Sequence, residues 1–138
     1  MCTMTMDEYL NLITIHIFDY YDFPLFFITK TNKNQYYLNY YVEGVNEYTD
    51  KWFFSEISND ERLQLIEQRI SSLELLKRLL KNQRLYYLFV THAEGSQLKF
   101  EQINQDNLDP DGFPEKEYFV EYDFVSQQKL NSPFINGI

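Results

Sequence analysis

Apolar and polar residues alternate along the first third of the chain, which predicts β-strands. The stretch 13–17 alternates with a period of two residues, and 25–30 has strand character directly after a proline. A polar turn at 31–34 then leads into 36–43, where the alternation resumes. Two strands around a short polar turn indicate a hairpin, with one apolar face and one amphipathic face rich in tyrosine.

Further segments with strand character follow later in the chain. Residues 51–57 come after a predicted loop at 44–50. The segment 84–92 has apolar residues at both odd and even positions, which is typical of a central strand covered by helices on one side. Alternation returns at 98–101 and again at 118–124, on either side of a polar loop.

Helix-initiation signals lie between these two groups of strands. Ser58 to Glu61 and Ser71 to Glu74 each have the sequence of a capping box, so two helices are predicted within about 59–82. Helical spacing places three apolar residues on the inner face of the first helix: Leu63, Ile66 and Ile70. A similar box at Thr5 to Glu8 predicts a short helix near the N-terminus.

This order of elements predicts the fold class α+β. We expect a mainly antiparallel sheet of about six to seven strands, with a two-helix insertion at about 59–82 packed on one face. Residues 1–125 should form a single domain, because the chain is long enough for one core and too short for two ordinary domains. Residues 126–138 are predicted to form a poorly ordered tail.

Charge and composition narrow the classes of function. The 138 residues include 12 Lys and Arg against 21 Asp and Glu, a formal charge of −9. An acidic surface repels phosphate backbones, so direct nucleic-acid binding is not expected. The single cysteine, Cys2, excludes an internal disulfide, and no stretch approaches the roughly 20 apolar residues that span a bilayer. We therefore expect a soluble, cytoplasmic protein with no membrane segment and no cofactor.

The stretch Tyr20 to Phe27 resembles a pattern of an uncharacterised bacterial domain family of unknown function, in which a Tyr/Asp-rich strand runs into Pro-Leu-x-Phe. Further points of similarity follow in the family's order: Tyr37-Leu38, Ser58 to Leu63, Ile70 to Leu73 and Pro110-Asp111-Gly112. The chain departs from the pattern around the helix junction, where Gln68, Arg69 and Glu74 replace a glycine and an arginine. The resemblance implies a small bacterial domain of conflict or accessory-gene settings, and it supplies no catalytic residues.

Candidate catalytic and metal-binding groups are few. His16 and His92 are the only histidines, and neither belongs to a pattern with metal-ligand spacing, so no metal site is predicted. Asp19 and Asp22 flank two tyrosines, and paired carboxylates beside aromatic rings could act as acid and base in a hydrolase. Aspartates before a proline more commonly make local hydrogen bonds in a turn. We therefore predict no catalytic residues, and a hydrolase that uses Asp19 and Asp22 is the least favoured hypothesis.

The predicted helices and the strand after them are the basic part of the chain. Residues 61–90 contain six basic and three acidic residues, whereas the segments on either side each contain nine acidic and three basic residues. A basic set here could hold an anionic small molecule, in a pocket between the sheet and the helices. Its candidate anion-binding residues are Arg69, Lys77, Arg78, Lys81 and Arg84. The alternative is an ordinary solvated helix face with local ion pairs.

The tyrosines point to an interaction surface. Tyr37 and Tyr41 should project from the more polar face of the hairpin, and tyrosine is enriched at interfaces because it buries area and keeps a hydrogen-bonding tip. The alternative is that these rings only fill cross-strand pairs. The predicted interaction residues are Tyr20, Tyr21, Tyr37, Tyr41 and Trp52.

The leading functional hypothesis is therefore a non-enzymatic domain that binds a protein partner, or a second copy of itself, through the aromatic sheet face or an edge strand. An inhibitor or accessory component of a bacterial or phage conflict system is a specific form of this hypothesis. A sensor of an anionic small molecule is the alternative.

Overall fold

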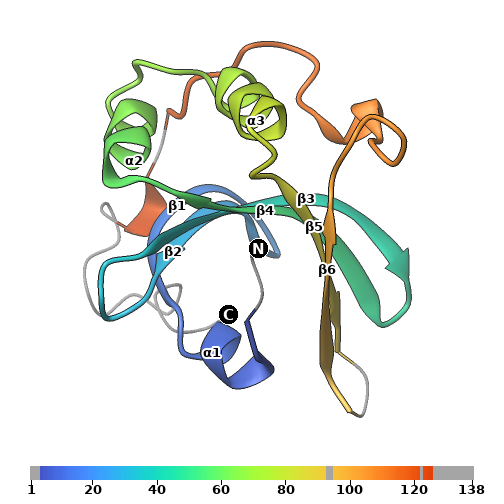
Figure 1. Cartoon of the computed structure of the whole chain (residues 1–138). Coiled ribbons are helices and arrows are strands. Elements are labelled where there is room, and N and C mark those ends of the chain that lie inside the picture. Colours follow the sequence, from blue (N-terminus) through green and yellow to red (C-terminus); the bar gives the residue numbers. More distant parts are fainter. Residues whose placement is uncertain (1–3, 93–94, 122, 126–138) are drawn as a thin grey trace.

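The computed structural model describes residues 4–92, 95–121 and 123–125, and its centre is one antiparallel sheet in which each strand pairs with the next along the chain (Figure 1). The six strands are β1 (Ile13–Tyr21), β2 (Phe23–Lys30), β3 (Tyr36–Asn46), β4 (Thr49–Ile57), β5 (Tyr86–Thr91) and β6 (Gln97–Gln102). The helices of this part of the chain are α1 (Met6–Leu10), α2 (Asn59–Ile66), α3 (Ser72–Lys81) and the 3-10 turn η1 (Pro110–Gly112). The predicted α+β class with an antiparallel sheet is confirmed.

Capping residues fix where each helix begins, as the sequence predicts. Thr5 Oγ1 accepts the backbone N–H of Glu8 at 3.1 Å, and the Glu8 carboxylate accepts the backbone N–H of Thr5 at 3.0 Å. Ser58 and Glu61 make the same reciprocal pair at the start of α2. Ser71 caps α3 through its hydroxyl oxygen. Each cap stabilises its helix by about 1 kcal/mol and sets the angle at which the chain enters it.

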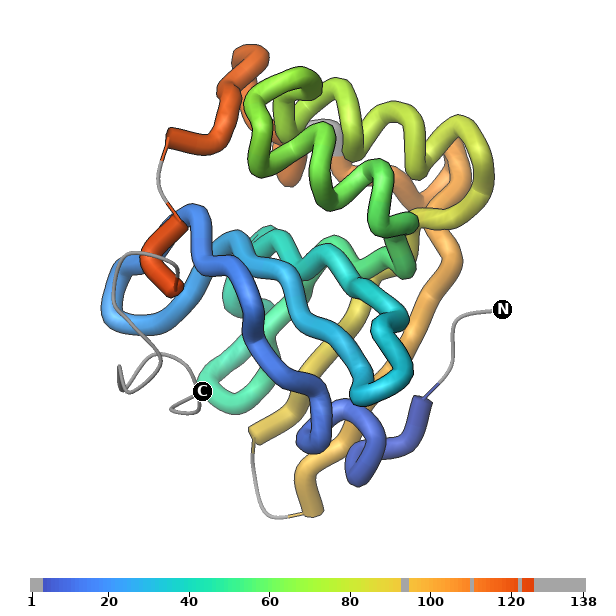
Figure 2. Tube along the Cα trace, turned by 90° about the vertical axis from the view of Figure 1, so that its left-hand side faces the viewer, coloured from blue at the N-terminus to red at the C-terminus, as the bar shows by residue number. Residues whose placement is uncertain are grey.

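The two faces of the sheet carry separate apolar cores. The helix face is the one covered by α2 and α3 (Figures 1 and 2). Leucines of these helices share a buried core with sheet residues such as Phe53. The open face is the opposite one, and α1 lies against part of it (Figure 1). Successive residues of β4 alternate between the faces: Phe53 packs in the first core and Trp52 in the second. The buried residues of the open face are Ile17, Phe27, Trp52, Phe54, Leu88 and Val90.

The prediction of a loop at 44–50 is wrong, because β3 and β4 both continue into this segment. Gly44 pairs with Asp50 and Asn46 pairs with Thr49, so the β3–β4 hairpin extends almost to its tip. The Asn46 side chain closes the turn by accepting the backbone N–H of Tyr48 at 2.9 Å. Asparagine and glycine in this segment therefore belong to a long hairpin and its tight turn.

The strand predicted at 118–124 is also wrong. The carbonyl of Tyr118 accepts the backbone N–H of Ser72 at 2.9 Å, and the carbonyl of Val120 accepts a hydrogen bond from the Gln68 side chain at 2.8 Å. These backbone groups therefore bond to the α2–α3 junction instead of to a sheet edge. The alternating pattern reflects packing against helices, and Val120 contacts the core of the helix face. The predicted tail at 126–138 lies outside the described residues.

Candidate functional site

A cavity of about 780 Å³ opens on the open face of the sheet, between α1 and the ends of the strands. Met6, Tyr9 and Leu10 of α1 form one side. The β1–β2 hairpin, the start of β4 and the end of β5 form the rest of the wall. The volume lies within the range of about 300–1,000 Å³ that is usual for ligand pockets. The five-residue helix α1 covers only part of this face, which leaves the cavity open beside it.

Aromatic rings form the floor of the cavity around Trp52, whose exposed fraction is 7%. The ring of Phe27 meets the indole edge-on, with centroids 5.6 Å apart. The ring of Tyr41, on the neighbouring strand β3, also meets the indole edge-on, with centroids 5.2 Å apart. Phe23 packs edge-on against both Tyr41 and Trp52. Edge-to-face contacts of this kind hold rings in defined orientations, so the floor is preorganised.

The polar side of the cavity centres on Asp50. Its Oδ2 lies 3.1 Å from Nε2 of His92, a side chain that is 60% exposed. Burial and the nearby charge of Asp50 raise the pKa of Tyr9 to about 12. Burial, Asp50 and Glu43 likewise raise the pKa of Tyr41. The direction of both pKa shifts shows that the surroundings of Asp50 disfavour a further negative charge.

The charges that line the cavity are unbalanced in sign. Asp22 and Asp50 are lining residues, and none of the described residues that line the cavity is a lysine or an arginine. Lys51, which neighbours Asp50 in the chain, lies on the helix face with its ammonium 4.1 Å from the centroid of the Tyr87 ring. The cavity is therefore an aromatic site with an acidic edge.

Four of the five predicted interaction residues pack in the core of the open face: Tyr20, Tyr37, Tyr41 and Trp52. Tyr20 and Trp52 line the cavity and Tyr41 contacts Trp52, whereas Tyr21, at the end of β1, is 74% exposed and is not a lining residue. Tyr37 lies farther along the face, where it stacks on Phe54 with ring centroids 5.2 Å apart. The contacts of Tyr37 and Tyr41 are cross-strand aromatic pairs, so these two rings also stabilise the sheet.

The two aspartates of the hydrolase hypothesis are not brought together. Asp19 is opposite Phe26 in the register, and its charge acts on Tyr40, which packs with Phe26 on the helix face. Asp22 lines the cavity on the open face and has a positive φ of 64°. The positive φ allows a single residue to join β1 to β2, which is a turn role for Asp22.

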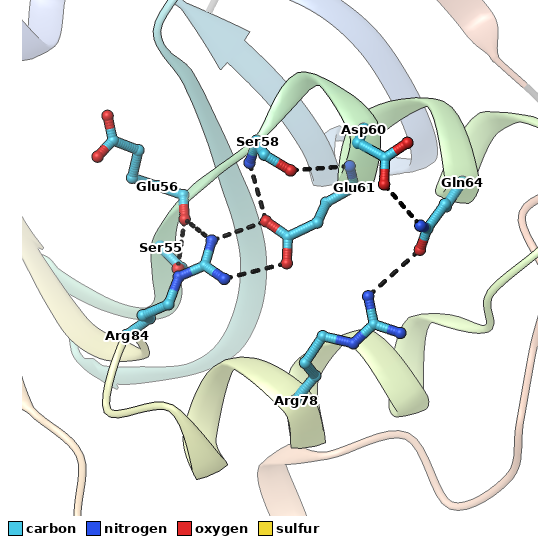
Figure 3. Close-up of polar contacts among 8 residues, drawn as sticks. All are labelled: Ser55, Glu56, Ser58, Asp60, Glu61, Gln64, Arg78 and Arg84. Atoms are coloured by element: carbon cyan, nitrogen blue, oxygen red, sulfur yellow. Dashed lines mark hydrogen bonds and ion pairs between the residues drawn. The ribbon is translucent and has the colours of Figure 1, made fainter.

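The predicted anion-binding residues are also spread out, and three of them have partners within the fold. Arg84 forms an ion pair with Glu61 at 2.7 Å and donates to the carbonyl of Glu56 at 3.0 Å (Figure 3). Arg78 donates to Gln64 on α2 at 3.2 Å (Figure 3). Arg69 pairs with Glu67 in an exposed position. Lys77 and Lys81 are exposed on α3, and no member of the set lines the cavity.

A polar chain centred on His16 is the feature that the sequence did not predict. Asp123 Oδ2 lies 2.5 Å from Nδ1 of His16, and Arg62 donates to Nε2 at 3.0 Å. The imidazole is 8% exposed and lies on the helix face, away from His92. This chain ties the segment around Asp123 to β1 and α2. His16 and Asp123 are 107 residues apart in sequence, so no local pattern could have indicated the contact.

The described residues contain no cluster of three or more His, Cys, Asp or Glu that could hold a metal ion. None of the helices described is both long and apolar enough to cross a membrane.

The fold and the site together define an α+β domain with one antiparallel sheet, two helices on one face and an aromatic cavity on the other. A family model matches residues 5–134, and the chain belongs to that family, the family of unknown function DUF6575. Membership in a family of unknown function is thus confirmed. No curated protein matches the chain. No solved structure matches it either.

Proposed function

We propose that the chain is a non-enzymatic interaction domain that binds a partner protein through the open face of its sheet, at the cavity and its rim. The observation that carries the proposal is the exposure of large apolar side chains around a preformed cavity. Leu10 and Phe23 both line the cavity and are 69% and 40% exposed. A cavity that can take an anchor side chain, surrounded by apolar residues that exclude water, is the usual anatomy of a binding hot spot.

Binding is better supported than catalysis by the groups that the cavity contains. His92 and Asp50 form the kind of pair found in acid–base relays. However, the imidazole is 60% exposed, whereas electrostatic catalysis depends on groups held in a water-excluded site. The second carboxylate of the hydrolase hypothesis lies on the other face of the sheet, as described above.

The proposal is tested by partner capture with two matched double variants. Leu10→Ser with Phe23→Ser removes the apolar rim. Tyr118→Ser with Phe119→Ser removes side chains that are 56% and 47% exposed in the segment beside α3. The tagged chain is purified from its native host, co-purifying proteins are quantified, and light scattering gives the mass of the eluted species.

We expect a stoichiometric partner, or a second copy of the chain, whose recovery falls at least tenfold with the rim variant and is unchanged with the control. Hot-spot substitutions of about 2 kcal/mol or more imply losses of this size. Equal recovery with both double variants would contradict the proposed surface.

The wider setting is part of the same proposal. We propose a cytoplasmic, bacterial protein that acts as an inhibitor or accessory component of a conflict system and binds no nucleic acid directly. The formal charge of −9 supports the absence of direct nucleic-acid binding, and the single cysteine supports a reducing compartment such as the cytoplasm.

A small-molecule sensor is the second candidate, because the cavity volume suits a ligand. The sequence predicts such a pocket between the sheet and the helices, with an anionic ligand. The cavity instead lies on the open face, and none of its described lining residues is a lysine or an arginine, which argues against an anion in it. A thermal-shift screen tests this candidate, since a ligand at 100 times its dissociation constant stabilises the fold by about 2.7 kcal/mol.

A further inference from the structure

We infer that the cavity on the open face is a binding site for an organic ammonium group, held over the aromatic floor with Asp50 as its counter-ion. The inference rests on the proposed function in one respect, because a lysine side chain of the partner is one source of that group. A free small amine is the other source, and both have the same chemistry.

The aromatic floor has the composition that attracts cations. The faces of aromatic rings carry negative potential, and tryptophan attracts a cation most strongly. Trp52 lies at the centre of the floor, with Phe23 and Tyr41 packed edge-on around it. An ammonium group with an apolar body therefore gains both ring contact and apolar burial here.

Asp50 supplies the opposite charge, and one of its oxygens is available. Oδ2 faces His92 at 3.1 Å, whereas Oδ1 accepts no hydrogen bond within the part of the chain that is described. Asp22 adds a second carboxylate to the lining. None of the described lining residues is a lysine or an arginine, and the one histidine, His92, faces a single oxygen of Asp50, so the electrostatic complement of this site is a cation.

Trp52 provides a second indication that the cavity takes a polar ligand. Its indole N–H donates no hydrogen bond to any described residue, and no buried side-chain nitrogen or oxygen of these residues lacks a partner, so the N–H is accessible. An accessible donor can take a partner from a ligand. A ligand with an acceptor atom near its ammonium group, such as a hydroxyl or a peptide carbonyl, would provide one.

The experiment uses the full chain and two pairs of probes. Choline is compared with its neutral isostere 3,3-dimethylbutan-1-ol. Nα-acetyl-lysine methylamide is compared with Nα-acetyl-norleucine methylamide, which lacks the ammonium group. Trp52 is the only tryptophan, so its fluorescence and its single indole N–H signal in NMR spectra report on the cavity without ambiguity. Titration of both signals gives the affinity of each probe.

We expect at least one cationic probe to saturate and to shift the indole signal, with an affinity at least tenfold higher than that of its neutral isostere. Asp50→Asn should weaken the cation about tenfold and leave the neutral isostere unchanged, since an ion pair and a cation–π contact have magnitudes of this order. Asp106→Asn, which removes the same charge outside the cavity lining, should change neither affinity. Equal affinities for cation and isostere would overturn the inference, as would an Asp50→Asn variant that binds the cation normally.

The wild-type titrations keep the inference falsifiable if Asp50→Asn does not fold, because they need no variant. The probe pairs also separate the two sources: choline binding alone indicates a free amine, and binding of the lysine compound alone indicates a partner side chain. If no cationic probe binds but partner capture depends on the rim, the inference fails and the proposed function stands. If the cation binds and partner recovery is the same with the rim variant as with the control variant, the inference stands and the proposed function fails.

Discussion

The ion pair between Arg84 and Glu61 offers a direct test of the structure, because it joins the segment between α3 and β5 to α2. Two guanidinium nitrogens of Arg84 reach the two carboxylate oxygens of Glu61 at 2.7 and 3.1 Å (Figure 3). The side chain of Glu61 is 8% exposed and that of Arg84 is 38% exposed. The substitution Arg84→Met keeps an unbranched apolar side chain, removes the guanidinium group and leaves the Glu61 carboxylate without its cation.

The magnitude follows from the burial of Glu61. Removing one partner of a fully buried pair costs about 3–5 kcal/mol, because an uncompensated charge remains. Water can approach the site of Arg84, and the backbone N–H of Ser58 still donates to Glu61 at 2.8 Å. Solvent screening therefore reduces the expected loss to about 2 kcal/mol. In urea, with a slope of about 2 kcal/mol/M, the midpoint should fall by roughly 1 M.

The effect should depend on pH in a defined direction. Burial alone would raise the pKa of Glu61, but hydrogen bonds from Arg84 and Ser58 outweigh it, so the pKa lies below the ordinary 4.5. The stabilisation is complete above that ordinary value and is lost as the pH falls through the lowered pKa of the folded state. In Arg84→Met, protonation of Glu61 relieves the unpaired charge. The difference in free energy of unfolding should thus shrink below about pH 4.5.

Urea titrations at pH 7 and at about pH 4 measure both the loss and its pH dependence. Arg69→Met is the matched control, since Arg69 and Glu67 are both more than half exposed, and such a pair contributes under about 1 kcal/mol. A loss for Arg84→Met no larger than that of the control would refute the reasoning. A loss that stayed constant as Glu61 became protonated would refute its electrostatic part.

Two further substitutions test the packing of the loop after β6. Gly112→Ala should lower the free energy of unfolding by about 1–3 kcal/mol in urea titrations, because the added Cβ would lie 3.1 Å from the Phe53 ring inside the core of the helix face. An unchanged urea midpoint would contradict this close approach. Tyr87→Phe should cost about 1–2 kcal/mol, because it leaves the backbone N–H of Asp109 without the phenolic oxygen it reaches at 2.7 Å. Tyr48→Phe, at an exposed tyrosine, is the control for that substitution, and an equal effect of the two would show that the bond is unimportant.

Local signals predicted most of the fold, and the errors fall where contacts are long-range. Capping sequences located the helices, because a cap is a contact between residues three positions apart. The inner face of α2 was less well predicted: Leu65 is fully buried, although the helical spacing favoured Leu63 and Ile66. In a helix of eight residues the orientation depends on the ion pair with Arg84 as much as on the apolar pattern.

The site was predicted only in its aromatic part. Tyr20 and Trp52 stand out in the sequence because of their residue type, and both line the cavity. No sequence pattern indicates Asp50, because its role in the site depends on Tyr9 of α1 and Tyr41 of β3, which come near it only in the folded chain. His92 was recognised as one of two histidines, but its partner lies 42 residues away. Residue type can indicate a binding surface, whereas the position of a charge within it is set by tertiary contacts.

The asymmetry of the sheet explains why function should be sought on one face. The helix face is covered by α2 and α3, and Arg78 and Arg84, which join α2 to α3 and to the segment before β5, already have partners. The open face has a preformed aromatic floor, and of the described residues α1 covers part of it while Phe124 and Val125 pack against its core. A helix as short as α1 is stable only through its cap and its packing. It covers part of the open face, while Leu10 and Phe23 stay exposed to water, which costs free energy. A domain that needed only stability would bury those side chains. Keeping Leu10 and Phe23 in water beside an acidic, aromatic cavity is physically reasonable if a ligand or partner covers them.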